Sequence, residues 1–258
     1  MRIVHIGLKR TVLQVLTVVV IIAGLGRCLA AEEASKQQTV GALVQKIIDA
    51  YGGKAVLEKV HSLSERAVLE SPAIEGPASY TVDLREDRKL RVEKRAAGYY
   101  ELRLLNGSQG WYQSTNSAPL AVSGARLLAM VYQFKEIMMP RLLMTSSFTV
   151  ADGGAAEVNG EPARLLLLTD AEGPPIRLYV DGKNGRILKS SGVFSMGDAQ
   201  TELASEFHDL RFVDGRLLPF RIVNYAGGRR IGEVRVREYR VNPELPASLF
   251  TPVPAEGR

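Results

Sequence analysis

The sequence predicts an α+β fold that is mainly antiparallel β, and two features carry that prediction. Within residues 176–241, apolar and polar residues alternate with a period of two in short segments at residues 176–180, 210–212, 218–222 and 234–236, and a longer polar segment leads from the turn at residues 181–185 to Leu210. Such alternation is typical of strands with one buried face. Short turns such as Asp214-Gly215 and Gly227-Gly228 separate these segments and supply the positive φ that tight hairpins need. The pattern therefore indicates consecutive antiparallel strands in one broad sheet with an apolar concave face, and not βαβ units.

The first 30 residues combine a basic start, an apolar run and small residues that suit cleavage. Residues 12–26 are almost entirely apolar, and Ala30 ends the segment. This arrangement is typical of a secretory signal peptide, and the run is shorter than the roughly 20 residues of a membrane span. We therefore predict a signal peptide at residues 1–30, with a retained anchor as the alternative, and a flexible tether at residues 31–38.

The net charge does not indicate a nucleic-acid partner. The chain of 258 residues carries 33 basic and 28 acidic residues, which gives a formal charge of +5. Four of the basic residues lie before residue 31, where no acidic residue occurs, so the remainder is close to neutral. Hydrophobic residues make up 46% of the chain, which is enough for one sizeable core. We expect the protein to be peripheral to a membrane at most.

Cys28 is the only cysteine in the chain. A lipoprotein signal requires a small residue before the cysteine, whereas Arg27 stands there, so lipidation at Cys28 is not expected. Cleavage after Ala30 would remove Cys28 and leave no thiol for a disulfide or for nucleophilic chemistry.

Helices and strands follow the tether in an order that predicts one domain over residues 39–254. Apolar residues recur at helical spacing over residues 40–51, and Gly52-Gly53 ends that helix. A second, short helix is expected at about residues 54–60. Short alternating strands with polar or glycine-rich turns then occupy residues 63–112.

An apolar insert interrupts the sheet at residues 125–144. Four of the six methionines lie in it, and Pro140 is expected to break or kink it into two helical pieces. Methionine is flexible and polarizable, which suits an adaptable apolar surface such as a lid over a cavity. The alternative is a core helix that fills the hollow of the sheet permanently.

The phase of the alternation slips in the last strand. Val234 and Val236 share one face, whereas Tyr239 and Val241 share the other. A β-bulge near residues 237–238 would account for the slip.

A curved apolar face under the insert would suit an apolar ligand, so we treat the inner-face residues and the apolar residues of the insert as candidate cavity lining. The alternative is that these residues simply form core. The candidates are Val82, Leu84, Leu90, Val92, Tyr100, Leu102, Leu104, Leu127, Met130, Val131, Phe134, Met138, Phe220 and Ile222.

Several short motifs occur in a distinctive order along the chain: Ala50-Tyr51-Gly52-Gly53, Gly107 with Gly110-Trp111, Tyr179-Val180-Asp181 before Asn184-Gly185, Phe207-His208-Asp209, Val213-Asp214-Gly215 before Leu218-Pro219-Phe220, and Asn242-Pro243 with Phe250. Over roughly residues 38–254 this order resembles the outer-membrane lipoprotein-sorting superfamily, the LolA/LolB-like periplasmic lipoprotein carriers, and especially its exported relatives of unassigned function. The resemblance implies an incomplete, half-open β-barrel curved around one or two helices, with a helical lid over a cavity that receives acyl chains. No gating residue of the family can be assigned to a position in this chain.

Catalysis and metal binding have little support in the sequence. His208 and Asp209 are neighbours in a strand and so point to opposite faces, and His61 lies far away along the chain. The chain has no HExxH, GxSxG, Walker or CxxC motif. We therefore expect no enzyme activity, no catalytic residue, no metal site and no cofactor.

The expected function is non-catalytic binding or carriage of a lipid or an acylated polypeptide in the periplasm of a bacterial cell envelope. The partners would be lipid acyl chains or a lipoprotein, held by burial of their hydrocarbon. The alternative is a sensor or scaffold that binds another envelope protein without a lipid cargo, which a resemblance to the sensor domains of envelope stress signalling keeps open.

Overall fold

The computed structural model describes residues 39–197 and 199–253. The chain divides into two compact units, residues 1–42 and residues 43–258, and each is described by itself. Of the first unit only residues 39–42 are described, and they are helical. The expected signal peptide at residues 1–30 and the expected tether at residues 31–38 lie outside the described residues. In the part of the chain that is described, no helix is both long enough and apolar enough to cross a membrane.

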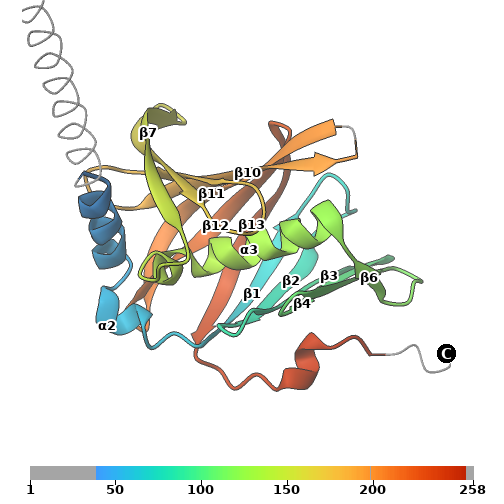
Figure 1. Cartoon of the computed structure of the whole chain (residues 1–258). Helices are drawn as coiled ribbons and strands as arrows, with labels where there is room; N and C mark the ends of the chain where they lie inside the picture. The colour runs from blue at the N-terminus through green and yellow to red at the C-terminus, as the bar shows by residue number, and fades with distance from the viewer. Residues whose placement is uncertain (1–38, 198, 254–258) are drawn as a thin grey trace, which may run out of the picture. The chain divides into compact units, whose positions relative to one another are not determined.

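Thirteen antiparallel strands form a single open sheet in the second unit (Figure 1). Its edges do not meet, and helices are few, so the predicted α+β class with a mainly antiparallel, half-open architecture is confirmed. The strands are β1 (Ser62–Glu70), β2 (Ala78–Arg85), β3 (Lys89–Ala96), β4 (Tyr99–Asn106), β5 (Gln109–Ser114), β6 (Leu120–Val122), β7 (Thr149–Val158), β8 (Glu161–Thr169), β9 (Ile176–Val180), β10 (Ile187–Met196), β11 (Ala199–Val213), β12 (Arg216–Ala226) and β13 (Arg229–Val241).

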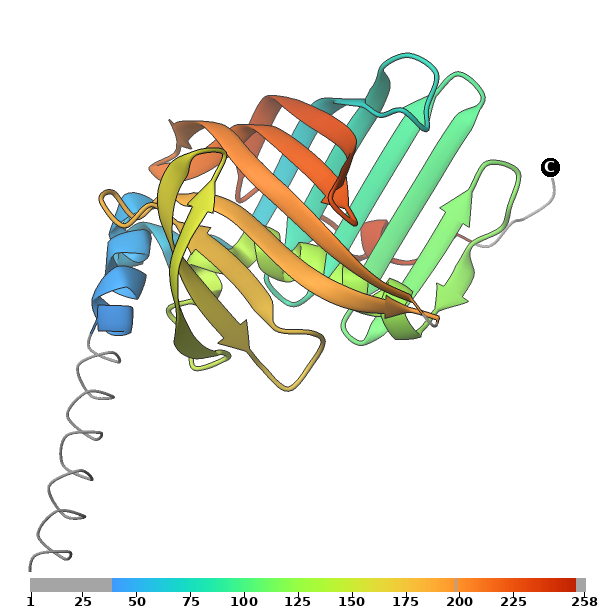
Figure 2. The ribbon, with the colours of Figure 1, turned by 90° about the horizontal axis from the view of Figure 1, so that it is seen from above.

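The strand order places the two ends of the insert at opposite edges of the sheet. The order is β6-β5-β4-β3-β2-β1-β13-β12-β11-β10-β9-β8-β7, so β6 and β7 are the edge strands. The helix α3 (Gly124–Leu142) connects them and runs across the concave side, with β1–β5 on one side of it and β10–β13 on the other (Figures 1 and 2). One long helix thus spans the hollow of the sheet.

Pro140 does not divide α3, contrary to the expectation of two helical pieces. The helix continues through Pro140 to Leu142. Proline lacks only the N–H that would bond the carbonyl of Glu136, and so near the end of a helix it costs little helical structure beyond itself. The insert is therefore a single helix with one interrupted bond in its last turn.

The helix packs closely against both walls of the sheet, at points where glycine leaves room. A Cβ at Gly110 in β5 would lie 2.8 Å from Leu127 Cδ1, and one at Gly192 in β10 would lie 3.3 Å from the ring of Tyr132. The same Tyr132 ring meets Phe194 edge to face, with 5.5 Å between ring centroids. These contacts fix the distance between α3 and each wall.

The last strand, β13, contains the β-bulge that the slip in its apolar–polar alternation predicts. Arg66 of β1 pairs with Glu238, whereas the next residue, Ala67, pairs with Val236, so Arg237 is the extra residue. The bulge turns Tyr239 to the same face as Val234, and both belong to the core under α3. This confirms the predicted position.

Shorter elements close the unit at its margins. Residues 43–50 are helical, and α2 (Lys54–Leu57) is shorter than the helix expected at about residues 54–60. The 3-10 helix η1 (Ala247–Phe250) packs on β3 and β4 with Phe250 fully buried. The face of β4 that points away from α3 is therefore covered by the end of the chain.

Candidate binding cavity

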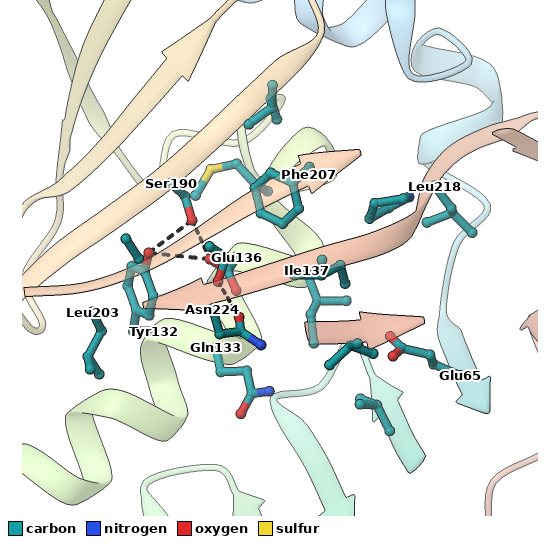
Figure 3. A pocket seen from close by; sticks show the side chains of 18 of the residues that line it. Glu65, Tyr132, Gln133, Glu136, Ile137, Ser190, Leu203, Phe207, Leu218 and Asn224 are labelled. Atoms are coloured by element: carbon teal, nitrogen blue, oxygen red, sulfur yellow. Dashed lines mark hydrogen bonds between the residues drawn. The ribbon is translucent and has the colours of Figure 1, made fainter. Parts of the chain in front are cut away.

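A cavity of about 270 Å³ lies between α3 and the strands β1–β4 and β9–β13. Strands from both halves of the sheet contribute to its apolar wall, with Val82 of β2 and Ile222 of β12 as examples. The helix contributes a stripe that includes Tyr132, Gln133 and Glu136 (Figure 3). The volume is close to the lower end of the roughly 300–1,000 Å³ that small-molecule sites span, so the cavity suits one small amphiphile or one acyl chain.

Glu65 is a buried carboxyl in the apolar wall of β1. It pairs with Val82 on one side and Tyr239 on the other, so its side chain faces the cavity. It is 4% exposed, and its Oε1 has no hydrogen-bond partner. Burial raises the pKa of Glu65 to about 7, although the Tyr239 hydroxyl and Arg66 act in the opposite direction. Near neutral pH this carboxyl therefore holds its proton for much of the time and can act as a donor.

Glu136 ties α3 to the wall of β10 (Figure 3). Ser190 Oγ donates to Glu136 Oε1, and the Tyr132 hydroxyl lies 3.3 Å from the same oxygen and 2.9 Å from Ser190 Oγ. Ser205 is opposite Ser190 in the β10–β11 pair and so faces the helix as well. Burial raises the pKa of Glu136, and hydrogen bonds from these hydroxyls lower it by less. A small polar cluster thus joins the helix to this wall.

Arg216 is a buried cation at the start of β12. It is 2% exposed, and its Nη2 donates to the backbone oxygen of Ile137 over 2.6 Å. Its Nε and Nη1 have no hydrogen-bond partner. Burial lowers the pKa of Arg216 to about 10, which the hydroxyls of Tyr239 and Tyr51 partly offset.

Charged residues of β3 and β4 complete the polar part of the lining. Lys94 Nζ lies 2.9 Å from Glu101, and Arg103 Nε lies 3.2 Å from the same carboxylate. Burial lowers the pKa of Lys94, with the nearby Arg103 adding to the effect. Lys94 and Arg103 both border the cavity, so its wall is more polar than the alternation of the strands suggests.

The candidate lining residues lie in three environments: the cavity wall, the packed core and the outer face of β4. Val82 and Ile222 border the cavity. Most of the others form the apolar core that packs against α3, or flank that core: Leu84, Leu90, Val92, Val131, Phe134 and Met138 are buried in it, Leu127 and Phe220 flank it, and Met130 is buried beside Gly110.

Tyr100, Leu102 and Leu104 were expected to line the cavity, and the strand register corrects this expectation. Val92 of β3 pairs with Arg103, so Arg103 faces inward and its neighbours in β4 face outward. Leu102 and Leu104 are nevertheless buried, because η1 packs on β4 from outside. Both faces of this strand are covered, and its alternation alone does not reveal which one is internal.

The two histidines considered in the sequence do not form a joint site. His61 Nδ1 lies 2.6 Å from Glu86, and His208 Nε2 lies 3.7 Å from Glu206. Within the described residues, no cluster of three or more His, Cys, Asp or Glu side chains is arranged to hold a metal ion. Neither histidine borders the cavity.

The class of fold is an open, curved antiparallel sheet whose hollow is crossed by one long helix, and several solved structures share it. A LolA superfamily protein from Nitrosomonas europaea is 15% identical and has a TM-score of 0.55, with 82% of this chain and 97% of that chain covered. A DUF1329 family protein from Desulfovibrio piger is 13% identical with a TM-score of 0.52, and the match covers 82% of this chain and 97% of the other.

A third similar structure is a candidate outer membrane lipoprotein-sorting protein domain from Vibrio parahaemolyticus, at 12% identity and a TM-score of 0.50, covering 81% of this chain and 94% of that chain. These likenesses confirm the resemblance to the lipoprotein-sorting superfamily at the level of the fold. No family model matches the sequence, and no curated protein matches it.

Proposed function

We propose that this protein binds an amphipathic lipid, or the acyl chain of a lipidated polypeptide, without catalysis, and carries it in the periplasm of a bacterial cell envelope. The observation that carries the proposal is the cavity of about 270 Å³ between α3 and the curved sheet. The fold supports it, because the similar structures include a LolA superfamily protein and a candidate lipoprotein-sorting domain. The signal peptide expected at residues 1–30 would deliver the chain to that compartment.

Burial of hydrocarbon would supply the affinity. Each methylene group moved from water into the apolar part of the cavity contributes about 0.8 kcal/mol. Two added carbons therefore tighten binding by roughly tenfold or slightly more until the chain outgrows the cavity. The size of the cavity favours one acyl chain at a time, and a larger cargo would require α3 to move away from the wall of β10.

Native mass spectrometry of protein purified from a periplasmic fraction tests the proposal directly. We expect a co-purifying lipid, and we expect purified apo-protein to bind a series of fluorescent acyl probes with affinity that rises with chain length. Protein that carries no lipid and ignores the whole probe series would contradict the proposal. If such protein instead bound one defined envelope protein, the alternative of a sensor or scaffold without lipid cargo would replace it.

A further inference from the structure

Arg216 stands out because it is a buried cation without a buried anion. Its one acceptor is the backbone oxygen of Ile137, so the single N–H of Nε and both of Nη1 lack acceptors. No carboxylate among the described residues forms an ion pair with it. A buried charge that is left unpaired costs several kcal/mol, and proteins ordinarily neutralise it or supply a partner.

The surroundings of Arg216 add positive charge and hydroxyl groups. Arg141 lies close enough to lower the pKa of Arg216 further, and its own partner is Glu86 on the surface. The Tyr51 hydroxyl accepts a hydrogen bond from the backbone N–H of Ile187, and the Tyr239 hydroxyl donates to the backbone oxygen of Pro219. Both hydroxyls lie near Arg216 and offset the lowering of its pKa only in part. This end of the cavity is therefore electropositive, and the N–H groups of Arg216 Nε and Nη1 remain available to a ligand.

The cavity runs from Arg216 toward an exposed end. Along β12 its lining extends from Arg216 to Asn224, which is about 26 Å at roughly 3.3 Å per residue. Ile231 borders the cavity near Asn224 and is 45% exposed, so this end meets solvent. On β12 and β13 the lining between the two ends is apolar, with Leu218, Ile222 and Val234 as examples.

We propose that Arg216 binds the anionic end of a single-chain amphiphile, a long-chain carboxylate or an alkyl phosphate, whose hydrocarbon lies along β12 toward Ile231. This inference rests on the proposed lipid-binding function and names the ligand class and its orientation. The anion would take the free N–H groups of Arg216, with a charge-assisted bond that is stronger than one between neutral groups. Glu65, on the other side of Tyr239, would meet the ligand in its protonated form and so would not repel it.

The test compares ligands that share a chain and differ in the head group. Hexadecanoate, monohexadecyl phosphate and hexadecanol displace a fluorescent acyl probe from the purified protein at about pH 6, where the first two are anions and Glu65 still holds its proton. Wild-type protein should bind each anion at least about tenfold more tightly than the alcohol, because a hydrogen bond to a charged group is worth that much or more. The relative affinity of carboxylate and phosphate identifies the head group.

Two variants assign the preference to Arg216. Arg216→Met keeps the length of the side chain and removes the charge, and it should bind the alcohol as wild-type protein does while losing the preference for both anions. Arg240→Met is the matched control, since Arg240 lies on the outer face of β13 in an exposed pair with Glu238, and it should keep the preference. An unchanged preference in Arg216→Met would overturn the inference.

A measurement on wild-type protein tests the inference even if Arg216→Met does not fold. The carboxyl carbon of bound [1-¹³C]hexadecanoate is followed by NMR during a pH titration, and beside Arg216 its pKa should stay well below the ordinary range for a carboxyl. A carboxyl that titrates as it does in water would place the head group at the exposed end and overturn the inference. Equal binding of the alcohol and the anions would leave lipid binding intact but remove the role of Arg216, whereas binding of none would remove both.

Discussion

The two faces of α3 are attached to the sheet by different interactions. On one face Val131, Phe134 and Met138 are buried in the continuous apolar core of β1–β3 and β13. On the other face Tyr132 and Glu136 border the cavity and are tied to β10 by a few hydrogen bonds. Apolar packing is worth several kcal/mol per large side chain, whereas a hydrogen bond contributes about 1 kcal/mol net. The helix is therefore firmly attached to one wall and weakly to the other, so opening for a ligand is expected on the β10 side.

The largest expected effect comes from the core face. Phe134→Ala should lower the free energy of unfolding by about 3–5 kcal/mol, because it removes a buried ring and leaves a void in close packing. Ile137→Ala should cost clearly less, because Ile137 borders the cavity and is partly exposed, so its truncation enlarges a space that already exists. Urea unfolding of the two variants measures the difference. Equal losses would show that the cavity face is packed as tightly as the core face.

Most strands outside residues 186–209 could be predicted, because they depend on alternation that a short window contains. β10 and most of β11 lie in the segment that was read as a polar connection, because their polar side chains hide the alternation. The turns at Asp214-Gly215 and Gly227-Gly228 and the bulge at Arg237 all follow from local chemistry. The side of a strand that faces a cavity depends on pairing, which a single segment does not encode. In β4 the inward residues include Arg103, and the outward leucines are buried only because η1 returns to cover them.

The candidate site was harder to predict, because the apolar character of a residue indicates that it packs in the core. A binding cavity is a space that the packed side chains leave empty, and polar residues can border it as well. The apolar stripe of α3 was predicted to line the cavity, but that stripe forms part of the core. The residues that border the cavity include Glu65, Glu136 and Arg216, which the apolar criterion excluded. One sequence feature could have found Glu65: it occupies an inward position of an alternating strand, between Leu63 and Ala67, where a charge is unexpected.

The cavity face should also give the protein a pH dependence that the core face lacks. Burial raises the pKa of Glu65 from 4.5 to about 7. Between these values the folded state retains a proton that the unfolded chain releases, so stability is full below about pH 4.5 and falls as the pH rises to 7. The shift corresponds to about 3 kcal/mol. Glu136, whose pKa is also raised by burial, acts in the same direction.

The contribution of Glu65 is isolated by comparing unfolding curves of wild-type protein and Glu65→Gln from pH 4.5 to 8. The difference between them should grow across this range in favour of the variant, because glutamine stays neutral. Glu238→Gln, at an exposed position on the outer face of β13, serves as the control and should follow the wild-type profile. A constant difference between Glu65→Gln and wild-type protein would show that Glu65 does not titrate in this range.

A smaller effect is expected from filling the cavity. Leu203 of β11 borders the cavity, is partly exposed and does not belong to the apolar core (Figure 3). Leu203→Trp should weaken binding of a long acyl probe by about tenfold, equivalent to about 1.4 kcal/mol, with little change in stability. Titration with the probe and thermal unfolding provide the two measurements. Leu120→Trp on the exposed edge strand β6 is the matched control and should bind as wild-type protein does.

The smallest effect tests the weak attachment itself. Ser190→Ala removes a hydrogen bond to Glu136 and should cost about 1 kcal/mol, with faster amide hydrogen exchange in the last turns of α3. Its neighbour Ser191 is a sharp control, because it is fully buried and its hydroxyl has no partner, so Ser191→Ala should be neutral or slightly stabilising. Exchange that accelerates equally in both variants would mean that loss of a buried hydroxyl loosens the sheet in general. Acceleration in Ser190→Ala alone would locate the opening of the cavity between α3 and β10, since only that variant breaks a bond joining the two.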